Sequence, residues 1–261
     1  MKSARCSGFG AALVMGGLLI AAAIAVVVIA APPDSSPAGP ALPPPPRPAF
    51  TPENVPLGER PVAYWAPVVA ATTVRDRPAG SGTLAEVETR TPEGTANLVL
   101  ISRQARRAAG RLWVRVRAAG SPDDVYGWVP RPSLGGYTPV RTRLLVDRVR
   151  LTVTLFRDGR RVFRTGAGIG APQTPTPSGR FYVRNKLHRY DSPFYGPVAF
   201  GTSARSAAAS DWPAGGFVGI HGTNHPELIP GRVSAGCIRL ENRAILRLAH
   251  LMDVGTPVRV R

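Results

Sequence analysis

Cysteine is nearly absent from this chain, and that scarcity limits its chemistry. Of its 261 residues only Cys6 and Cys237 are cysteines. A framework of several disulfides, the usual support of small exported domains, is therefore excluded. A single cysteine after the first 31 residues, with scattered histidines, also lacks the ligand spacing of a zinc site, so no metal is expected. The absence of a Gly-x-Ser-x-Gly string argues against a serine hydrolase with a nucleophile elbow.

Lysine and acidic residues are scarce as well. The chain has 33 Lys and Arg residues against 16 Asp and Glu, for a net charge of +17, and Lys2 and Lys186 are its only lysines. A balance this basic favours an anionic partner without naming it. A hydrophobic fraction of 44% is enough for a real core, while Gly and Pro, at 28 residues each, favour turns and a linker over a helical bundle.

Charge is missing altogether from the N-terminal segment after Lys2 and Arg5, and an apolar run extends over residues 9–31. About 20 such residues cross a bilayer. Two interpretations remain open: a membrane anchor formed by residues 9–31, or a signal peptide (residues 1–31) cleaved near Ala30. Both place residues from 32 onward outside the cytoplasm, at the cell envelope. Nucleic acid, the usual partner of a basic cytosolic protein, is therefore not expected.

Proline dominates residues 32–60, including four in a row at 43–46. Such a segment favours extended polyproline geometry and cannot build a core. We interpret it as a linker, either a semi-rigid spacer or a tether without a defined length.

Residues 61–138 have the pattern of short strands and turns, with strands expected at 83–88, 96–102, 111–117 and 126–130. The Val-Arg-x-x-Pro opening at 74–78, the Trp-Val-Arg-Val string at 113–116 and the final Gly-Trp-Val at 127–129 resemble a bacterial SH3-like domain. The resemblance implies a small barrel that binds a cell-wall polymer. For Trp113 and Trp128, packing in the core is favoured over contact with a ligand.

Residues 142–261 predict a second, mostly antiparallel β-domain. Strands are expected at 148–156, 161–165, 180–184, 217–221 and 258–261, with a hairpin turn at Asp158-Gly159. Apolar residues at helical spacing predict one short helix over 241–252.

Cys237 would be the only exported cysteine, and an unpaired thiol in an oxidising compartment is a liability unless its reactivity is used. Its string is Ser-Ala-Gly-Cys-Ile-Arg-Leu at 234–240, and His221 lies sixteen residues upstream. We interpret Cys237 as a nucleophile and His221 as its base. The Gly222 carbonyl would orient His221. Backbone N–H groups from Ala235 to Cys237, with Gly236 allowing close approach, would form an oxyanion hole, and Arg239, on the face of Cys237, would hold a carboxylate.

These residues resemble the catalytic domain of the L,D-transpeptidase (YkuD-like) family, with His-Gly-Thr at 221–223 followed by Ser-x-Gly-Cys-Ile-Arg-Leu. The Thr-Pro-Ser-Gly turn at 176–179 and the Tyr195-Gly196 pair extend the match. The resemblance implies a mainly β fold overall, a small SH3-like barrel followed by a YkuD-like β-sandwich with one short helix. It also implies crosslinking of peptidoglycan stem peptides through a cysteine thioester, with a donor tetrapeptide, an acceptor amine and no cofactor.

By motif, the resemblance makes Cys237 the nucleophile and His221 the general base, with Gly222, Ala235 and Gly236 as orienting or oxyanion groups. Ser234, Thr223, Tyr195 and Arg239 would contact substrate. Many members have His where this chain has Ala235, so side-chain help at that position is lost. Two alternatives stay open: an inactive or weak wall-binding protein, and an L,D-carboxypeptidase that uses water as acceptor.

Arginines are dense around the first hairpin of the second domain. They are Arg141, Arg143, Arg148, Arg150, Arg157, Arg160, Arg161 and Arg164. A solvated face is the simpler interpretation, and attraction to anionic wall polymers or lipid head groups is the functional one.

Overall fold

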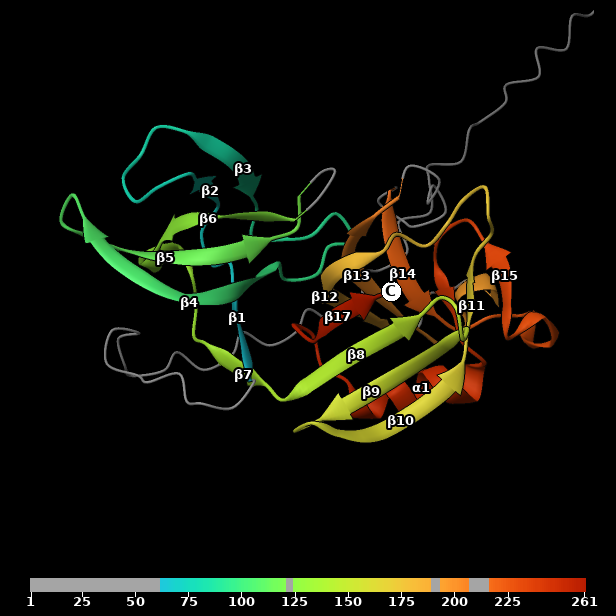
Figure 1. Ribbon diagram of the computed structural model, residues 1–261. Coiled ribbons are helices and arrows are strands. Elements are labelled where there is room, and N and C mark those ends of the chain that lie inside the picture. Colours follow the sequence, from blue (N-terminus) through green and yellow to red (C-terminus); the bar gives the residue numbers. More distant parts are fainter. Residues whose placement is uncertain (1–61, 121–123, 189–192, 207–215) are drawn as a thin grey trace, which may run out of the picture. The chain divides into compact units, whose positions relative to one another are not determined.

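A computed structural model describes residues 62–120, 124–188, 193–206 and 216–261 of the chain (Figure 1). The predicted anchor or signal segment and the proline-rich linker lie outside these described residues. Within the described ranges, no helix is both long enough and apolar enough to cross a membrane.

The fold is mainly β, as predicted, and the first sheet has seven strands in the order β3-β2-β6-β5-β4-β1-β7. Their bounds are β1 Ala63–Pro67, β2 Thr72–Arg75, β3 Thr83–Val87, β4 Leu98–Ala108, β5 Arg111–Ala118, β6 Val125–Pro130 and β7 Thr138–Val140. A 3₁₀ turn, η2 Arg131–Ser133, follows β6.

The strands expected at 83–88, 111–117 and 126–130 correspond to β3, β5 and β6. The strand expected at 96–102 is wrong in length, because β4 continues to Ala108 past a register shift between Ile101 and Ala105. Trp113 and Trp128 are both 7% exposed, in agreement with core packing. The SH3-like assignment of this sheet and its binding to wall polymer stay predictions.

The second sheet has ten strands in the order β10-β9-β8-β17-β12-β13-β14-β16-β11-β15. Their bounds are β8 Thr142–Asp147, β9 Thr152–Arg157, β10 Arg160–Gly166, β11 Gly168–Gly170, β12 Gly179–His188, β13 Val198–Arg205, β14 Phe217–His221, β15 Gly231–Ser234, β16 Ile238–Arg239 and β17 Pro257–Val260. Two 3₁₀ turns, η3 Pro193–Tyr195 and η4 Pro226–Leu228, lie in the connections.

Strand β12 divides this sheet into two halves by changing its partner. Residues Gly179 to Tyr182 pair with β17, and residues from Val183 onward pair with β13. Three pairs are parallel, namely β8 with β17, β14 with β16 and β11 with β15. The domain is mostly antiparallel, as predicted, but the parallel β14–β16 pair, which carries the candidate site, could not be read from the sequence.

The strand predicted over 148–156 is wrong in its first part, because the observed strand, β9, begins only at Thr152. The structure has a turn at 148–151, between β8 and β9, which pair antiparallel. The Asp147 carboxylate accepts the N–H groups of Val149 and Arg150 at 3.1 and 2.9 Å, and Leu151 has a φ of +51°. Apolar and polar residues keep alternating through this turn, so periodicity cannot locate it.

The hairpin turn at Asp158-Gly159 is confirmed. Both residues have positive φ, +50° and +82°, the geometry of the tight turns that favour Asp-Gly. It joins β9 to β10 with Arg157 opposite Arg160.

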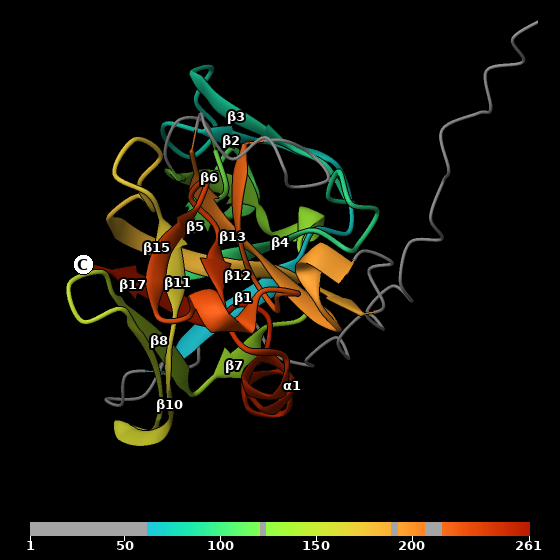
Figure 2. The same ribbon diagram turned by 90° about the vertical axis from the view of Figure 1, so that its right-hand side faces the viewer.

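The predicted helix is confirmed as α1, Asn242–Leu251. It buries Ala244, Ile245 and Leu248, the members of its apolar stripe. These side chains join one core with Leu155 of the first half of the sheet and Ile220 of the second. In Figure 1 α1 lies behind β9 and β10, and Figure 2 agrees in placing it on one side of β10. The opposite face of these strands is therefore not covered by the helix.

Candidate active site

Parallel pairing of β14 with β16 brings the two chemistry-bearing segments together. Ile220 is opposite Ile238, and His221 is opposite Arg239. Paired residues of neighbouring strands share a face, so one step back along both strands sets Cys237 beside Gly219. The Gly219 N–H donates to the Cys237 Sγ at 3.3 Å. The predicted nucleophile therefore lies next to the strand that ends at the predicted base.

His221 is fully buried, and its Nδ1 is 2.6 Å from the Gly222 carbonyl oxygen. A carbonyl only accepts, so Nδ1 carries the proton and Nε2 holds the lone pair. This Nε2 is buried and has no hydrogen-bond partner among the described residues. The predicted role of the Gly222 carbonyl matches this geometry.

Burial lowers the pKa of His221 from 6.5 to about 4, because the interior disfavours the imidazolium. The hydrogen bond to Gly222 opposes this effect, and the Arg239 charge adds to it. At neutral pH the ring is therefore neutral, with Nε2 able to accept a proton.

An aromatic wall surrounds the His221 ring. The Tyr195 ring meets it edge-on at 4.7 Å between centroids, and the Phe194 ring lies at 5.9 Å. The Arg239 guanidinium sits over the Phe194 ring at 4.4 Å. Arg239 makes no ion pair within the described ranges, and its Nε is buried without a hydrogen bond there. A cation held by a ring rather than by a carboxylate can still bind an anion.

The turn before Cys237 is shaped by hydrogen bonds. The Ser234 hydroxyl donates to the Cys237 carbonyl at 2.5 Å, and its oxygen accepts the Gly236 N–H at 3.2 Å. Gly236 has a φ of +117°, which favours glycine. The prediction that the Gly236 N–H points into an oxyanion hole is therefore wrong, because this N–H donates to the Ser234 hydroxyl oxygen instead. Ala235 is half-buried.

Thr176 supports the same turn and was missed as a site residue. Its hydroxyl donates to the Gly236 carbonyl at 2.8 Å and accepts the Gly170 N–H at 2.9 Å. In the sequence this threonine belongs only to the Thr-Pro-Ser-Gly turn motif, and no local pattern indicates a contact with a residue 60 positions away.

Asn242 is a second residue that the sequence did not reveal. Its Oδ1 accepts the Thr223 N–H at 2.9 Å. A methyl group at Gly196 or Gly222 would lie 2.4 or 2.3 Å from the same oxygen. Asn242 therefore packs against the backbone that carries the Gly222 carbonyl. The sequence signal that could have identified Asn242 is a polar residue near the start of the predicted helix.

Thr223, predicted to contact substrate, is only 2% exposed. Its Oγ1 accepts the His225 N–H at 3.0 Å, so the side chain shapes the loop after His221. Within the described part of the chain, no group of three His, Cys, Asp or Glu side chains is arranged to hold a metal ion.

Comparison with known proteins finds one family. The profile of YkuD, the L,D-transpeptidase catalytic domain, matches residues 141–260. The putative L,D-transpeptidase YkuD of Bacillus licheniformis is 31% identical over 129 residues, which cover 49% of this chain and 71% of that protein. The Bacillus subtilis protein of the same name is 33% identical over 109 residues, 42% of this chain. The matched part spans 59% of the length of the Bacillus subtilis protein.

Among solved structures, the catalytic domain of the E. faecium L,D-transpeptidase acylated by ertapenem is 29% identical to this chain. The match covers 46% of this chain and 97% of that domain, with a TM-score of 0.37. The L,D-transpeptidase from Mycobacterium smegmatis is 17% identical, with a TM-score of 0.37, over 62% of this chain and 99% of that one.

Proposed function

This chain belongs to the YkuD family of L,D-transpeptidase catalytic domains, and on that premise we propose that it crosslinks peptidoglycan stem peptides through a thioester on Cys237. The observation that carries the proposal is the buried, neutral His221, whose Nε2 lacks a partner among the described residues. It is the last residue of the strand whose Gly219 N–H donates to the Cys237 sulfur.

The first half of the reaction forms the thioester. His221 Nε2 takes the thiol proton, and the sulfur attacks the carbonyl carbon of the residue before the terminal D-alanine of the donor tetrapeptide. The C–N bond breaks, and the D-alanine amine leaves with the proton that His221 returns. The depressed pKa of His221 favours this return, because its imidazolium is a strong acid.

The second half transfers the acyl group. The acceptor amine attacks the thioester carbon and loses a proton, the C–S bond breaks, and the thiol is regenerated with its proton. No oxidant, metal or organic cofactor is required by this balance. Water in place of the amine would give L,D-carboxypeptidase activity from the same thioester.

Arg239 supports binding of an anionic part of the donor. Its guanidinium is half-buried over Phe194 without an ion pair among the described residues. An incoming carboxylate would pair with it through two hydrogen bonds. The terminal carboxylate of the D-alanine leaving group is such an anion.

The remaining predictions about partners belong to this proposal as well. We propose attachment to the membrane through residues 9–31, or secretion after cleavage near Ala30, and binding of wall polymer by the first sheet. Both place the enzyme where stem peptides are found.

The test is the intact mass of the full-length protein in neutral detergent after incubation with a carbapenem, with Cys237→Ala beside it. A single adduct on the native protein and none on the variant is expected. Incubation with a tetrapeptide donor, with and without an acceptor amine, then separates crosslinking from hydrolysis. A folded native protein that neither forms an adduct nor releases D-alanine would overturn the proposal in favour of an inactive wall-binding protein.

A further inference from the structure

One face of the second sheet carries arginines from four of its strands. Arg180 of β12 is opposite Arg259 of β17, and Arg259 is opposite Leu145 of β8. Leu145 is opposite Thr154 of β9, which is opposite Arg164 of β10. Since residues paired across strands share a face, these five positions form one line across the sheet.

A second line runs beside the first. Arg143 of β8 is opposite Phe156 of β9, and Phe156 is opposite Arg161 of β10. The Arg143 guanidinium lies 5.3 Å from the centre of the Phe156 ring. We call the set Arg143, Arg161, Arg164, Arg180 and Arg259 the arginine face. It lies opposite the core side that α1 covers, where Leu144, Val153 and Leu155 are buried.

Among the described residues, no acidic side chain neutralises the arginine face. All five members are exposed, and none makes an ion pair within the described ranges. The nearby acids are already engaged: Asp158 pairs with Arg141, and Asp147 pairs with Arg150 and Arg261. An uncompensated group of fixed positive charges attracts a polyanion.

The surface is hollowed along this face. Arg143, Arg180 and Arg259 line a hollow of about 500 Å³ together with Phe181 and Pro257. Arg117 closes one wall, since it donates a hydrogen bond to the Arg180 carbonyl and pairs with Asp124 at 2.6 Å.

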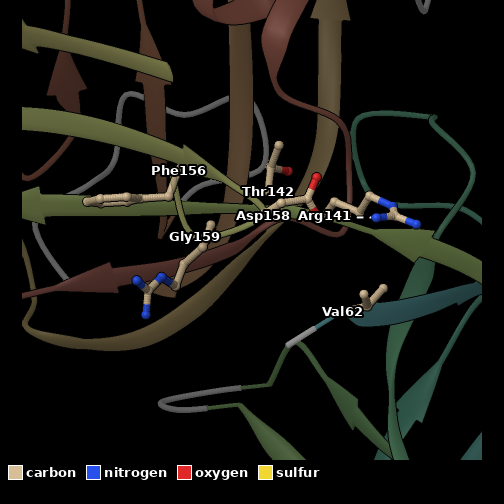
Figure 3. Close-up of a pocket in the computed structure, with 7 residues that line it drawn as sticks. Val62, Arg141, Thr142, Phe156, Asp158 and Gly159 are labelled. Carbon is tan, nitrogen blue, oxygen red and sulfur yellow. Dashed lines mark hydrogen bonds and ion pairs between the residues drawn. The ribbon is translucent and has the colours of Figure 1, made fainter. Parts of the chain in front are cut away.

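Arg143 also lines a second hollow, of about 310 Å³, at the end of the β9–β10 hairpin. Figure 3 shows Phe156 among the residues that line this hollow, together with the ion pair of Arg141 with Asp158. Because both hollows share Arg143, they give a chain-like ligand a longer path than either alone.

We propose that the arginine face binds a linear polymer of repeating phosphodiesters, held as a strand along these hollows. The arginine fork pairs with phosphate oxygens through two parallel hydrogen bonds. The lines cross strands about 4.8 Å apart, so several phosphates of one chain contact successive guanidinium groups.

A lipid surface fits this face less well. Proteins that lie on membranes place apolar side chains into the lipid beside their basic residues. Between the arginines lie Leu145, which is half-buried, and Thr154, which is 7% exposed. None of the exposed large apolar side chains of the described residues belongs to either line. The inference does not depend on the thioester chemistry, because none of these arginines belongs to the candidate active site.

The test titrates the full-length protein, in neutral detergent, with linear inorganic polyphosphate at several salt concentrations. The triple variant Arg143→Gln, Arg180→Gln, Arg259→Gln is compared with a control of equal charge, Arg232→Gln, Arg243→Gln, Arg247→Gln, three exposed arginines that lie outside both the arginine face and the first sheet. With about 0.7 counterions released per phosphate, five contacts give a slope of log K against log salt of roughly −3.5, and the triple variant makes this slope less steep by about 2. We expect at least tenfold weaker binding for the triple variant at moderate salt and little change for the control.

Equal weakening in both variants would overturn the proposal, because net charge alone would then explain the binding. An absence of polyphosphate binding would also overturn it. So would binding of polyglutamate or of phosphatidylglycerol micelles that is stronger than binding of polyphosphate and that the triple variant loses. Glutamine keeps much of the arginine stem, and unchanged thermal unfolding with unchanged carbapenem acylation shows that the triple variant is folded.

Discussion

The backbone N–H of Gly219 donates to the sulfur of Cys237 at 3.3 Å. The sulfur is thus held by the strand that ends at His221, and not only by its own loop. A backbone donor needs no side chain to position it, so the place of the proposed nucleophile depends on the β14–β16 register.

Replacement of Cys237 by Ser keeps an acceptor for the Gly219 N–H while it removes the thiol. We expect the free energy of unfolding of Cys237→Ser to stay within about 1 kcal/mol of the native value. Carbapenem acylation should fall below detection, because a hydroxyl is far less acidic than a thiol. Urea unfolding and intact mass measure the two effects. A variant that is acylated at the native rate would show that another residue is the nucleophile.

Acid should destabilise this protein partly through His221. Its pKa is about 4 in the folded state against 6.5 for an unperturbed ring, so the unfolded chain binds this proton first as the pH falls. The stability due to the neutral ring is complete above pH 6.5 and is lost between 6.5 and about 4. The full shift corresponds to roughly 3 kcal/mol.

The measurement is urea unfolding of the native protein and of His221→Asn at several values of pH in this window. The Asn side chain keeps an N–H for the Gly222 carbonyl but does not titrate. The difference in stability between the two proteins should shrink as the pH falls. Two parallel curves would contradict the depressed pKa.

Asn242 is expected to act as a positioning residue. Asn242→Ala removes the acceptor of the Thr223 N–H and loosens the backbone that carries the Gly222 carbonyl. We expect kcat for D-alanine release to fall roughly ten- to hundredfold with a smaller change in KM, because a misplaced base slows the chemical step. Asn242→Asp keeps the acceptor oxygen and should restore most of kcat. The exposed neighbour Arg243→Ala serves as control, and loss of kcat there, or failure of the Asp variant, would argue for a general structural role.

Two glycine substitutions separate crowding from backbone strain. A methyl group at Gly222 would lie 2.3 Å from the Asn242 Oδ1 and 3.0 Å from the Gly196 Cα, so Gly222→Ala should cost about 1–3 kcal/mol and most of the activity. At Gly159, with φ of +82° and nothing within 4 Å, Gly159→Ala should cost about 1 kcal/mol and leave activity intact. Urea unfolding and D-alanine release test both, and equal loss of activity would contradict the specific role of Gly222.

The sequence by itself determined most of the local elements and indicated which residues are the candidate reactive groups. Turn chemistry and hydrophobic periodicity depend on neighbours within a few residues. They predict the Asp158-Gly159 turn, the strand that ends at His221 and the helix after Glu241. Cys237 stands out because the chain is predicted to be exported, where a lone thiol is a liability unless it reacts, and His221 is its predicted base. The turn at 148–151 could not be predicted, because apolar and polar residues keep alternating through it.

Only the tertiary structure decided how these elements meet. The partner change of β12 and the parallel pairing of β14 with β16 join segments that are distant in sequence, and no local pattern specifies such pairings. Burial, which gives His221 its depressed pKa, comes from rings and strands brought in by those pairings. In the same way, Arg180 and Arg259 join Arg143 on one face only because β8, β17 and β12 are neighbours in the sheet.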